Sequence, residues 1–177
     1  MQERSDGASQ TNPAEVQRVI NIVKKLSGGH EVLPGDIGIV TPYSAQARAI
    51  KKILRGNAPE RTRFDAPADP TSMKAVEVST VDGFQGREKE VIVFSCTRAN
   101  MNGNVGFLAD TRRVNVMLTR AKRGLIIVGH MKTLQQDEII WKGWLKWARE
   151  SGLICGVAAS DSEAANRLAS IGMSSAH

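Results

Sequence analysis

The sequence predicts an α/β domain, with a parallel sheet that is covered by helices on both faces. Two observations predict this class. Short, continuously apolar runs alternate with amphipathic helical segments, and the runs are rich in Val and Ile. Strands buried on both faces have this composition, and parallel sheets are buried in this way. Ligands of such sheets bind just beyond the carboxyl ends of the strands, so we expect functional residues to follow the apolar runs.

The elements can be placed in order from hydrophobic periodicity and turn residues. Four helices are expected where apolar residues recur with a helical period: residues 13–26, 44–55, 111–122 and 134–150. Four strands are expected at the short β-rich runs: residues 37–40, 76–79, 91–94 and 125–128. Asn12 caps the first helix and Pro13 suits its first position, whereas Gly124 is expected to end the third. Residues 56–74 carry three prolines and are expected to form a long loop.

The composition divides the chain into one domain and two tails. Residues 1–11 are polar and are expected to be disordered, and residues 12–150 form the domain. Residues 151–177 are rich in Ser, Ala and Gly, and we expect a polar tail that is largely disordered or loosely packed. The length of 177 residues suits one such domain with tails.

Cysteine content, hydropathy and charge narrow the functional classes. Two cysteines cannot build a disulfide framework or a four-ligand zinc site, and the three histidines lack metal-ligand spacing, so no metal site is expected. No apolar run approaches the roughly 18 residues of a membrane span, and the N-terminus lacks the apolar region of a secretory signal. We therefore expect an intracellular protein, cytoplasmic or nuclear, with no membrane partner. The net charge of +6 permits a polyanionic partner.

Residues 80–88, TVDGFQGRE, form the most specific motif in the chain. Gly86 would let the backbone approach a phosphate closely, and Glu88 could accept a hydrogen bond from a ribose hydroxyl. Thr80 and Val81 could contact a sugar-phosphate backbone through hydroxyl and main-chain groups. The alternative interpretation is a strand-to-helix turn whose polar residues only cap the helix.

Residues 111–123 contain five basic residues within the third predicted helix and its end. Arg113 and Arg120 are seven positions apart, which places them on one face of a continuous helix. Arg120 could direct its planar guanidinium at a transferring γ-phosphoryl group and stabilise the developing negative charge. The alternative is that Arg120 stabilises the helix C-terminus and Arg113 is a structural ion-pair partner.

Thr41, Pro42 and Tyr43 follow the first predicted strand and therefore lie at the edge where ligands bind. An aromatic ring at this position could stack on a base or a ribose. The structural alternative is that Pro42 ends the strand and Ser44 caps the following helix.

Three motifs in this order resemble the second RecA-like domain of superfamily-one helicases of the nonsense-transcript regulator and senataxin group. IGIVTPYSAQ (37–46) resembles motif IV, STVDGFQGRE (79–88) resembles motif V, and GFLADTRRVNVMLTRAKR (106–123) resembles motif VI. The resemblance covers residues 12 to 150 and implies a RecA-like fold. It also implies the C-terminal motor half of an ATP-driven translocase on single-stranded RNA or DNA.

The resemblance assigns roles to individual residues. It implies that Arg120 is the catalytic arginine finger. It implies a nucleotide cleft built from motifs V and VI, with Gln85, Gly86, Glu88 and Arg113 as cofactor-binding residues. It implies contacts to the single strand at the ends of the first two strands, by Thr41, Pro42, Thr80 and Val81. Tyr43 joins this nucleic-acid-binding set as the aromatic that we expect to stack.

The sequence also departs from the family. It holds no G-x-x-x-x-G-K-[ST] motif, so this chain lacks the P-loop that cradles phosphates and ligates Mg²⁺. The resemblance therefore implies that ATP and Mg²⁺ are bound mainly by a P-loop-bearing first RecA-like domain, and that this chain alone hydrolyses ATP poorly or not at all. The alternative function is a non-catalytic module, derived from a helicase domain, that binds nucleic acid or a partner protein.

Overall fold

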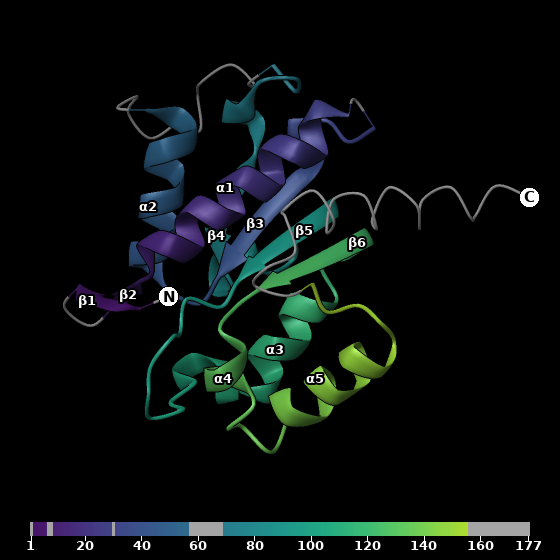
Figure 1. Cartoon of the computed structure of the whole chain (residues 1–177). Coiled ribbons are helices and arrows are strands. Elements are labelled where there is room, and N and C mark those ends of the chain that lie inside the picture. The colour runs from purple at the N-terminus through teal and green to yellow at the C-terminus, as the bar shows by residue number, and fades with distance from the viewer. Residues whose placement is uncertain (1, 7–8, 30, 57–68, 156–177) are drawn as a thin grey trace, which may run out of the picture.

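The computed structural model describes residues 2–6, 9–29, 31–56 and 69–155. The predicted loop over 56–74 and the predicted tail over 151–177 lie largely outside these residues. The described part of the chain forms a central sheet with helices on both faces, which confirms the predicted α/β class (Figure 1). Helix lengths and hydropathy in this part leave none that could cross a lipid bilayer.

Four parallel strands form the central sheet in the order β4-β3-β5-β6. They are β3 (Ile37–Thr41), β4 (Glu77–Thr80), β5 (Lys89–Ser95) and β6 (Ala121–Val128). Thr41 pairs with Thr80, and Ser95 pairs with Val128, so the carboxyl ends of all four strands meet at one edge. This parallel sheet is the RecA-like arrangement that the motifs predicted.

Helices cover the sheet in two separate layers (Figure 1). One layer consists of α1 (Pro13–Gly28) and α2 (Ser44–Arg55). The other consists of α3 (Thr111–Leu118), α4 (Met131–Leu134) and α5 (Trp141–Glu150). The described residues also contain four 3₁₀ turns: η1 (Pro34–Asp36), η2 (Met73–Ala75), η3 (Asp82–Phe84) and η4 (Gly106–Ala109).

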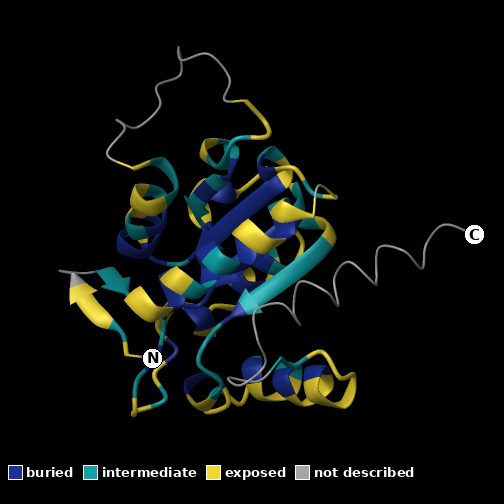
Figure 2. Cartoon of the chain, turned by 45° about the horizontal axis from the view of Figure 1, so that its top comes forward, coloured by how far each residue is buried: buried dark blue, intermediate teal, exposed yellow. Residues whose placement is uncertain are grey.

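Each layer has its own apolar core, because alternate residues of a strand face opposite sides of the sheet. In β5, Val91 and Val93 face the core under α1 and α2, whereas Ile92 and Phe94 face the core over α3 and α5. Figure 2 shows the buried strands between the two layers. Trp141 is fully buried in the second core, where its indole Nε1 donates a hydrogen bond of 2.9 Å to the Leu108 carbonyl.

The prediction that residues 1–11 are disordered is wrong for the residues described. Strands β1 (Arg4–Asp6) and β2 (Ser9–Thr11) form an antiparallel pair beside α2. The hydroxyl of Ser9 accepts a hydrogen bond of 3.0 Å from the Ala45 N–H. Ser9 therefore satisfies the first turn of α2, where Ser44 was expected to be the cap. Polar side chains order this segment through distant backbone groups, which local composition does not reveal.

The prediction of a helix over 111–122 that ends at Gly124 is also wrong. Helix α3 ends at Leu118, and Gly124 lies inside β6, where it pairs with Val91. The Thr119 hydroxyl donates back to the Asn115 carbonyl at 2.8 Å, and strand pairing with β5 then takes over the backbone. Arg120 consequently lies in the connection between α3 and β6, and it does not share a helical face with Arg113.

Candidate functional site

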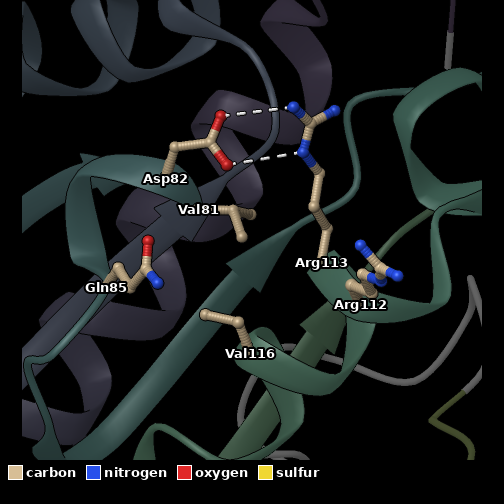
Figure 3. Close-up of a pocket in the computed structure, with 6 residues that line it drawn as sticks. All are labelled: Val81, Asp82, Gln85, Arg112, Arg113 and Val116. Atoms are coloured by element: carbon tan, nitrogen blue, oxygen red, sulfur yellow. Dashed lines mark hydrogen bonds and ion pairs between the residues drawn. The ribbon is translucent and has the colours of Figure 1, made fainter.

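A cavity of about 170 Å³ opens between η3 and the first turns of α3. The residues that line it are Val81, Asp82, Gln85, Arg112, Arg113 and Val116 (Figure 3). The cavity lies here because η3 continues from the carboxyl end of β4 and α3 lies on the same face of the sheet. Phe84 of η3 and Met117 of α3 are both fully buried in the core beneath it. The cavity therefore adjoins well-packed elements, and its walls combine four polar side chains with Val81 and Val116.

Arg113 is held across the mouth of this cavity by three neighbours. Its Nε lies 3.4 Å from Asp82 Oδ1, and its Nη2 donates to Asp82 Oδ2 at 3.4 Å (Figure 3). Asp110, which caps α3, lies 3.9 Å away, and the guanidinium carbon stands 4.6 Å from the centre of the Phe107 ring. These contacts fix the direction of the guanidinium while the side chain stays 35% exposed. The ion pair that the structural alternative predicted for Arg113 is thus present, within a cavity that also holds two further polar side chains.

Gln85, Arg112 and Arg113 give this cavity the chemistry of an anion site. Gln85 reaches it from η3, and Arg112 lies exposed beside Arg113 on α3 (Figure 3). Guanidinium groups match phosphate geometry because their planar donors can contact two oxygens at once. Asp82 opposes this charge, so an incoming phosphate would compete with Asp82 for Arg113. Sequence reasoning placed Gln85 and Arg113 in one cleft, and the structure brings both to the cavity.

Gly86 and Glu88 precede β5 and Arg120 precedes β6, so the three residues lie near the amino ends of two neighbouring strands. The Lys89 N–H donates to the Arg120 carbonyl at 3.2 Å, which joins Arg120 to the strand that follows Gly86 and Glu88. Glu88 forms an ion pair of 3.2 Å with Lys122. The hydrogen bond to the Glu88 carboxylate and the negative charge of that carboxylate raise the pKa of the Lys122 ammonium group. These three predicted residues are close to one another, but none of them lines the cavity itself.

The Arg120 side chain lies along the last turn of α3. Its Nε donates to the Val116 carbonyl at 3.0 Å, and its Nη2 donates to the Thr119 hydroxyl at 2.9 Å. Val116 also lines the cavity, so a single residue of α3 connects Arg120 to the cavity wall. Both acceptors belong to the C-terminal end of α3, so the guanidinium packs against the end of this helix.

Comparison with known proteins identifies the family of the chain. A family model described as an AAA domain matches residues 1–132. The Regulator of nonsense transcripts 1 homolog of Neurospora crassa is 42% identical over 76% of this chain. Helicase sen1 and ATP-dependent helicase upf1, both of Schizosaccharomyces pombe, are 36% and 37% identical over 76% and 85% of the chain.

The chain belongs to the superfamily-one helicases of the upf1 and sen1 type. It spans 12%, 8% and 15% of the lengths of these three relatives, in the order given.

The residues that helicase motifs IV and V place at the carboxyl edge are together, but most are buried. Thr41 is 0% exposed, and Tyr43 and Val81 are each 4% exposed, whereas Pro42 and Thr80 are partly exposed. The Thr41 hydroxyl shares a hydrogen bond of 3.0 Å with the Thr97 hydroxyl. The expectation that Tyr43 stacks on a base is wrong for this structure, because its ring is enclosed by the protein.

A buried polar cluster lies beneath this edge and explains the motif IV residues. Glu15 accepts hydrogen bonds through Oε1 from the Ser95 hydroxyl at 2.6 Å and from the Thr97 N–H at 2.7 Å. Gln46 donates to Ser95 at 2.9 Å and accepts from the Asn12 N–H at 2.8 Å. Burial raises the pKa of Glu15 to about 7. This cluster connects α1 and α2 to the carboxyl ends of β3 and β5. Its members therefore hold the carboxyl edge of the sheet in place.

Sequence reasoning missed Arg112 and Phe107 at this site. Arg112 was counted among the basic residues of motif VI, yet nothing in the pattern separated a cavity-lining arginine from a solvated one. Phe107 is 46% exposed although it lies in an otherwise apolar part of motif VI, where a core position is the usual expectation.

Gly106 provides a test of how tightly this edge is packed. Its φ of +56° is a conformation that residues with a Cβ adopt at a cost, and an added Cβ would lie 2.5 Å from the Tyr43 hydroxyl. We expect Gly106→Ala to lower the free energy of unfolding by about 1–2 kcal/mol, measured by urea denaturation. Gly86→Ala is the control, because Gly86 has a φ of +76° but open space around the added Cβ. Equal losses in the two variants would show that the contact with Tyr43 contributes nothing.

Proposed function

We propose that the chain is the C-terminal motor half of an ATP-dependent helicase. In this proposal Arg120 is the arginine finger, and Gln85, Gly86, Glu88 and Arg113 form this domain's side of the nucleotide cleft. The observation that carries the proposal is the hydrogen bond between Lys89 and Arg120, which holds the motif V turn and the motif VI arginine at one edge. Two motifs that are distant in the sequence would then face one bound triphosphate.

ATP and Mg²⁺ would be bound mainly by another domain. A helicase needs a phosphate cradle and a side chain that ligates Mg²⁺, and this sequence holds no P-loop to supply them. The partner is therefore a P-loop-bearing first RecA-like domain, against which Arg120 would close. The second partner is single-stranded RNA or DNA, in keeping with relatives that are named as an RNA helicase and a DNA helicase.

The proposal is tested by reconstituting the two halves. We would assay ATP hydrolysis by the chain alone, by the first domain of a relative alone, and by the two joined in one polypeptide, each with single-stranded RNA. The proposal predicts turnover only in the joined protein. Full turnover by the chain alone, or no gain on joining two folded domains, would contradict it.

A non-catalytic binding module is the second candidate, and the net charge of +6 without a P-loop favours it. We expect the chain alone to bind a labelled oligouridylate. If two or three phosphates are contacted, the affinity should fall about tenfold between 50 and 200 mM salt, because bound counterions return to the strand. Filter binding across a salt series measures this. Binding to RNA without any ATPase in the joined protein would support the module over the motor.

A further inference from the structure

We propose that Thr97 is a positioning residue for the single strand: its hydroxyl holds Thr41, and through Thr41 the motif V turn, at the carboxyl edge of the sheet. This inference rests on the proposed function, because it concerns the nucleic acid that the helicase domain would bind. Thr97 is itself 0% exposed, so it acts through the residues that it holds and does not touch the strand.

Thr97 has an unusual backbone conformation for its residue type. Its φ is +69°, whereas every other described residue with a positive φ is a glycine. The Arg98 N–H donates to the Cys96 carbonyl at 2.8 Å, which closes a three-residue turn around Thr97. A β-branched residue is strained in such a turn, and strain of this kind persists only where neighbouring contacts enforce it, most often at functional sites. The strain therefore indicates a role for the Thr97 side chain.

Two residues from the start of α1 hold the Thr97 backbone. Glu15 accepts a hydrogen bond from the Thr97 N–H at 2.7 Å, and Asn12 donates one from Nδ2 to the Thr97 carbonyl at 3.1 Å. Asn12 is the N-cap of α1, and its Oδ1 accepts from the Glu15 N–H at 3.2 Å. All three residues are 0% exposed. The start of α1 thus fixes the backbone from which the Thr97 hydroxyl projects.

Thr41 lies where pairing between β3 and β5 has ended. The register of these two strands stops one residue before Thr41. On this side Thr41 is held instead by the hydrogen bond of 3.0 Å between its hydroxyl and that of Thr97. On the other side it pairs with Thr80, and its carbonyl accepts from the Val81 N–H at 3.0 Å. Loss of the Thr97 hydroxyl would therefore release one side of the residue to which the motif V turn is bonded.

The residues that adjoin Thr41 have the access to solvent that Thr41 lacks. Pro42 follows it and Thr80 pairs with it, and both are partly exposed. The Thr80 hydroxyl also accepts from the Gly83 N–H at 3.2 Å, which ties it to η3. Contacts to a sugar-phosphate backbone through hydroxyl and main-chain groups depend on exact placement, because hydrogen bonds weaken steeply as their angle changes. Thr97 therefore affects affinity for the strand through placement and not through charge.

Thr97→Val and Thr97→Ser test this role as a matched pair, measured as binding of labelled oligouridylate to the full chain at low salt. Valine has nearly the same shape as threonine but no hydroxyl, whereas serine keeps the hydroxyl. We expect Thr97→Val to weaken binding about tenfold, which corresponds to one lost hydrogen bond, and Thr97→Ser to stay within about twofold of the original affinity. The salt dependence should be equal in all three proteins, because no cationic side chain changes.

Thr97→Gly removes the hydroxyl in a second way, since glycine adopts a positive φ without strain. It should weaken binding as much as Thr97→Val does. Titration at protein concentrations far above the Kd separates this effect from loss of folded protein: partial unfolding would lower the fraction of molecules that bind, whereas we expect that fraction to stay near one and the Kd to rise.

The outcomes distinguish this role from the proposed function. An unchanged Kd in the valine and glycine variants, or a Thr97→Ser variant as weak as Thr97→Val, would overturn the positioning role and leave the proposed function in place. Absence of any binding by the unchanged chain would overturn both this role and the proposed single-strand groove.

Discussion

Replacing Arg120 by alanine is expected to lower ATP turnover by about 10³-fold or more in a helicase that joins this chain to a P-loop-bearing first domain. An arginine finger acts only in the transition state, where its planar fork stabilises the charge that develops on the transferring phosphoryl group. The loss should therefore appear in kcat, with little change in KM. Steady-state kinetics at saturating single-stranded RNA measure it.

To contact a phosphate, the Arg120 guanidinium must exchange the hydrogen bonds that it now donates. Its guanidinium now donates to the Val116 carbonyl and to the Thr119 hydroxyl. The two present acceptors, a carbonyl and a hydroxyl, are neutral, whereas a phosphate oxygen is charged and can be contacted by two guanidinium donors at once, so the exchange is favourable when a phosphate becomes available. The same contacts imply that the alanine variant loses only about 1 kcal/mol of stability, so it should still fold.

Two further variants separate the finger from a general effect of charge. Arg123→Ala removes the same charge three residues away, from a side chain that is 82% exposed and paired with Glu90 at 2.9 Å. It should leave turnover within about twofold, since surface ion pairs contribute little. Arg120→Lys keeps the charge but loses the planar fork, and it should stay strongly impaired. Turnover near normal in Arg120→Ala would exclude the finger.

The sequence predicted the two central strands well, because β3 and most of β5 are buried on both faces. Such strands are recognisable as continuous apolar runs, and Val91–Phe94 illustrates this: each of its residues is 6% exposed or less. The C-terminal end of α3 was harder to predict, whereas its start at Thr111 was predicted correctly. Gly124 has the local signature of a helix end, yet pairing of β6 with β5 decides the backbone there, and that pairing joins residues about 33 positions apart.

The sequence indicated which residues lie near one another at the site, but it did not indicate which of its aromatic side chains is exposed to solvent. The resemblance placed Gln85 and Arg113 in one nucleotide cleft, and both side chains line one cavity in the structure. Exposure depends on what packs above a residue, so a motif alone could not show that Tyr43 is buried and Phe107 is exposed. Gly106 contributes to the burial of Tyr43. Because glycine has no Cβ, the backbone at Gly106 can lie against the Tyr43 hydroxyl.

Glu15 makes the stability of this domain depend on pH in an unusual direction. Its Oε2 is buried and has no hydrogen-bond partner among the described residues, and burial raises its pKa from 4.5 to about 7. A carboxyl with a raised pKa binds its proton more tightly when folded than when unfolded. The stability that this proton contributes is complete below pH 4.5 and is lost as the pH rises through about 7.

We therefore expect the free energy of unfolding to fall by about 2–3 kcal/mol between pH 4.5 and pH 8.5 because of Glu15 alone, at about 1.4 kcal/mol per unit of pKa difference. Glu15→Gln should remove this part of the pH dependence. Its side-chain oxygen can still accept from Ser95 and Thr97, and its amide carries no charge at any pH. Urea denaturation of both proteins across the pH range measures the difference.

Glu138→Gln is the matched control for this titration, because Glu138 is exposed and paired with Lys142, which lowers the pKa of its carboxyl group. Glu138→Gln should lose as much stability between pH 4.5 and pH 8.5 as the original protein does. Other groups that titrate in this range, such as His130, contribute equally to the original protein and to Glu15→Gln, so they cancel in the comparison. A Glu15→Gln profile parallel to that of the original protein would show that Glu15 is ionised at no cost, and that the polar cluster below the carboxyl edge holds its charge.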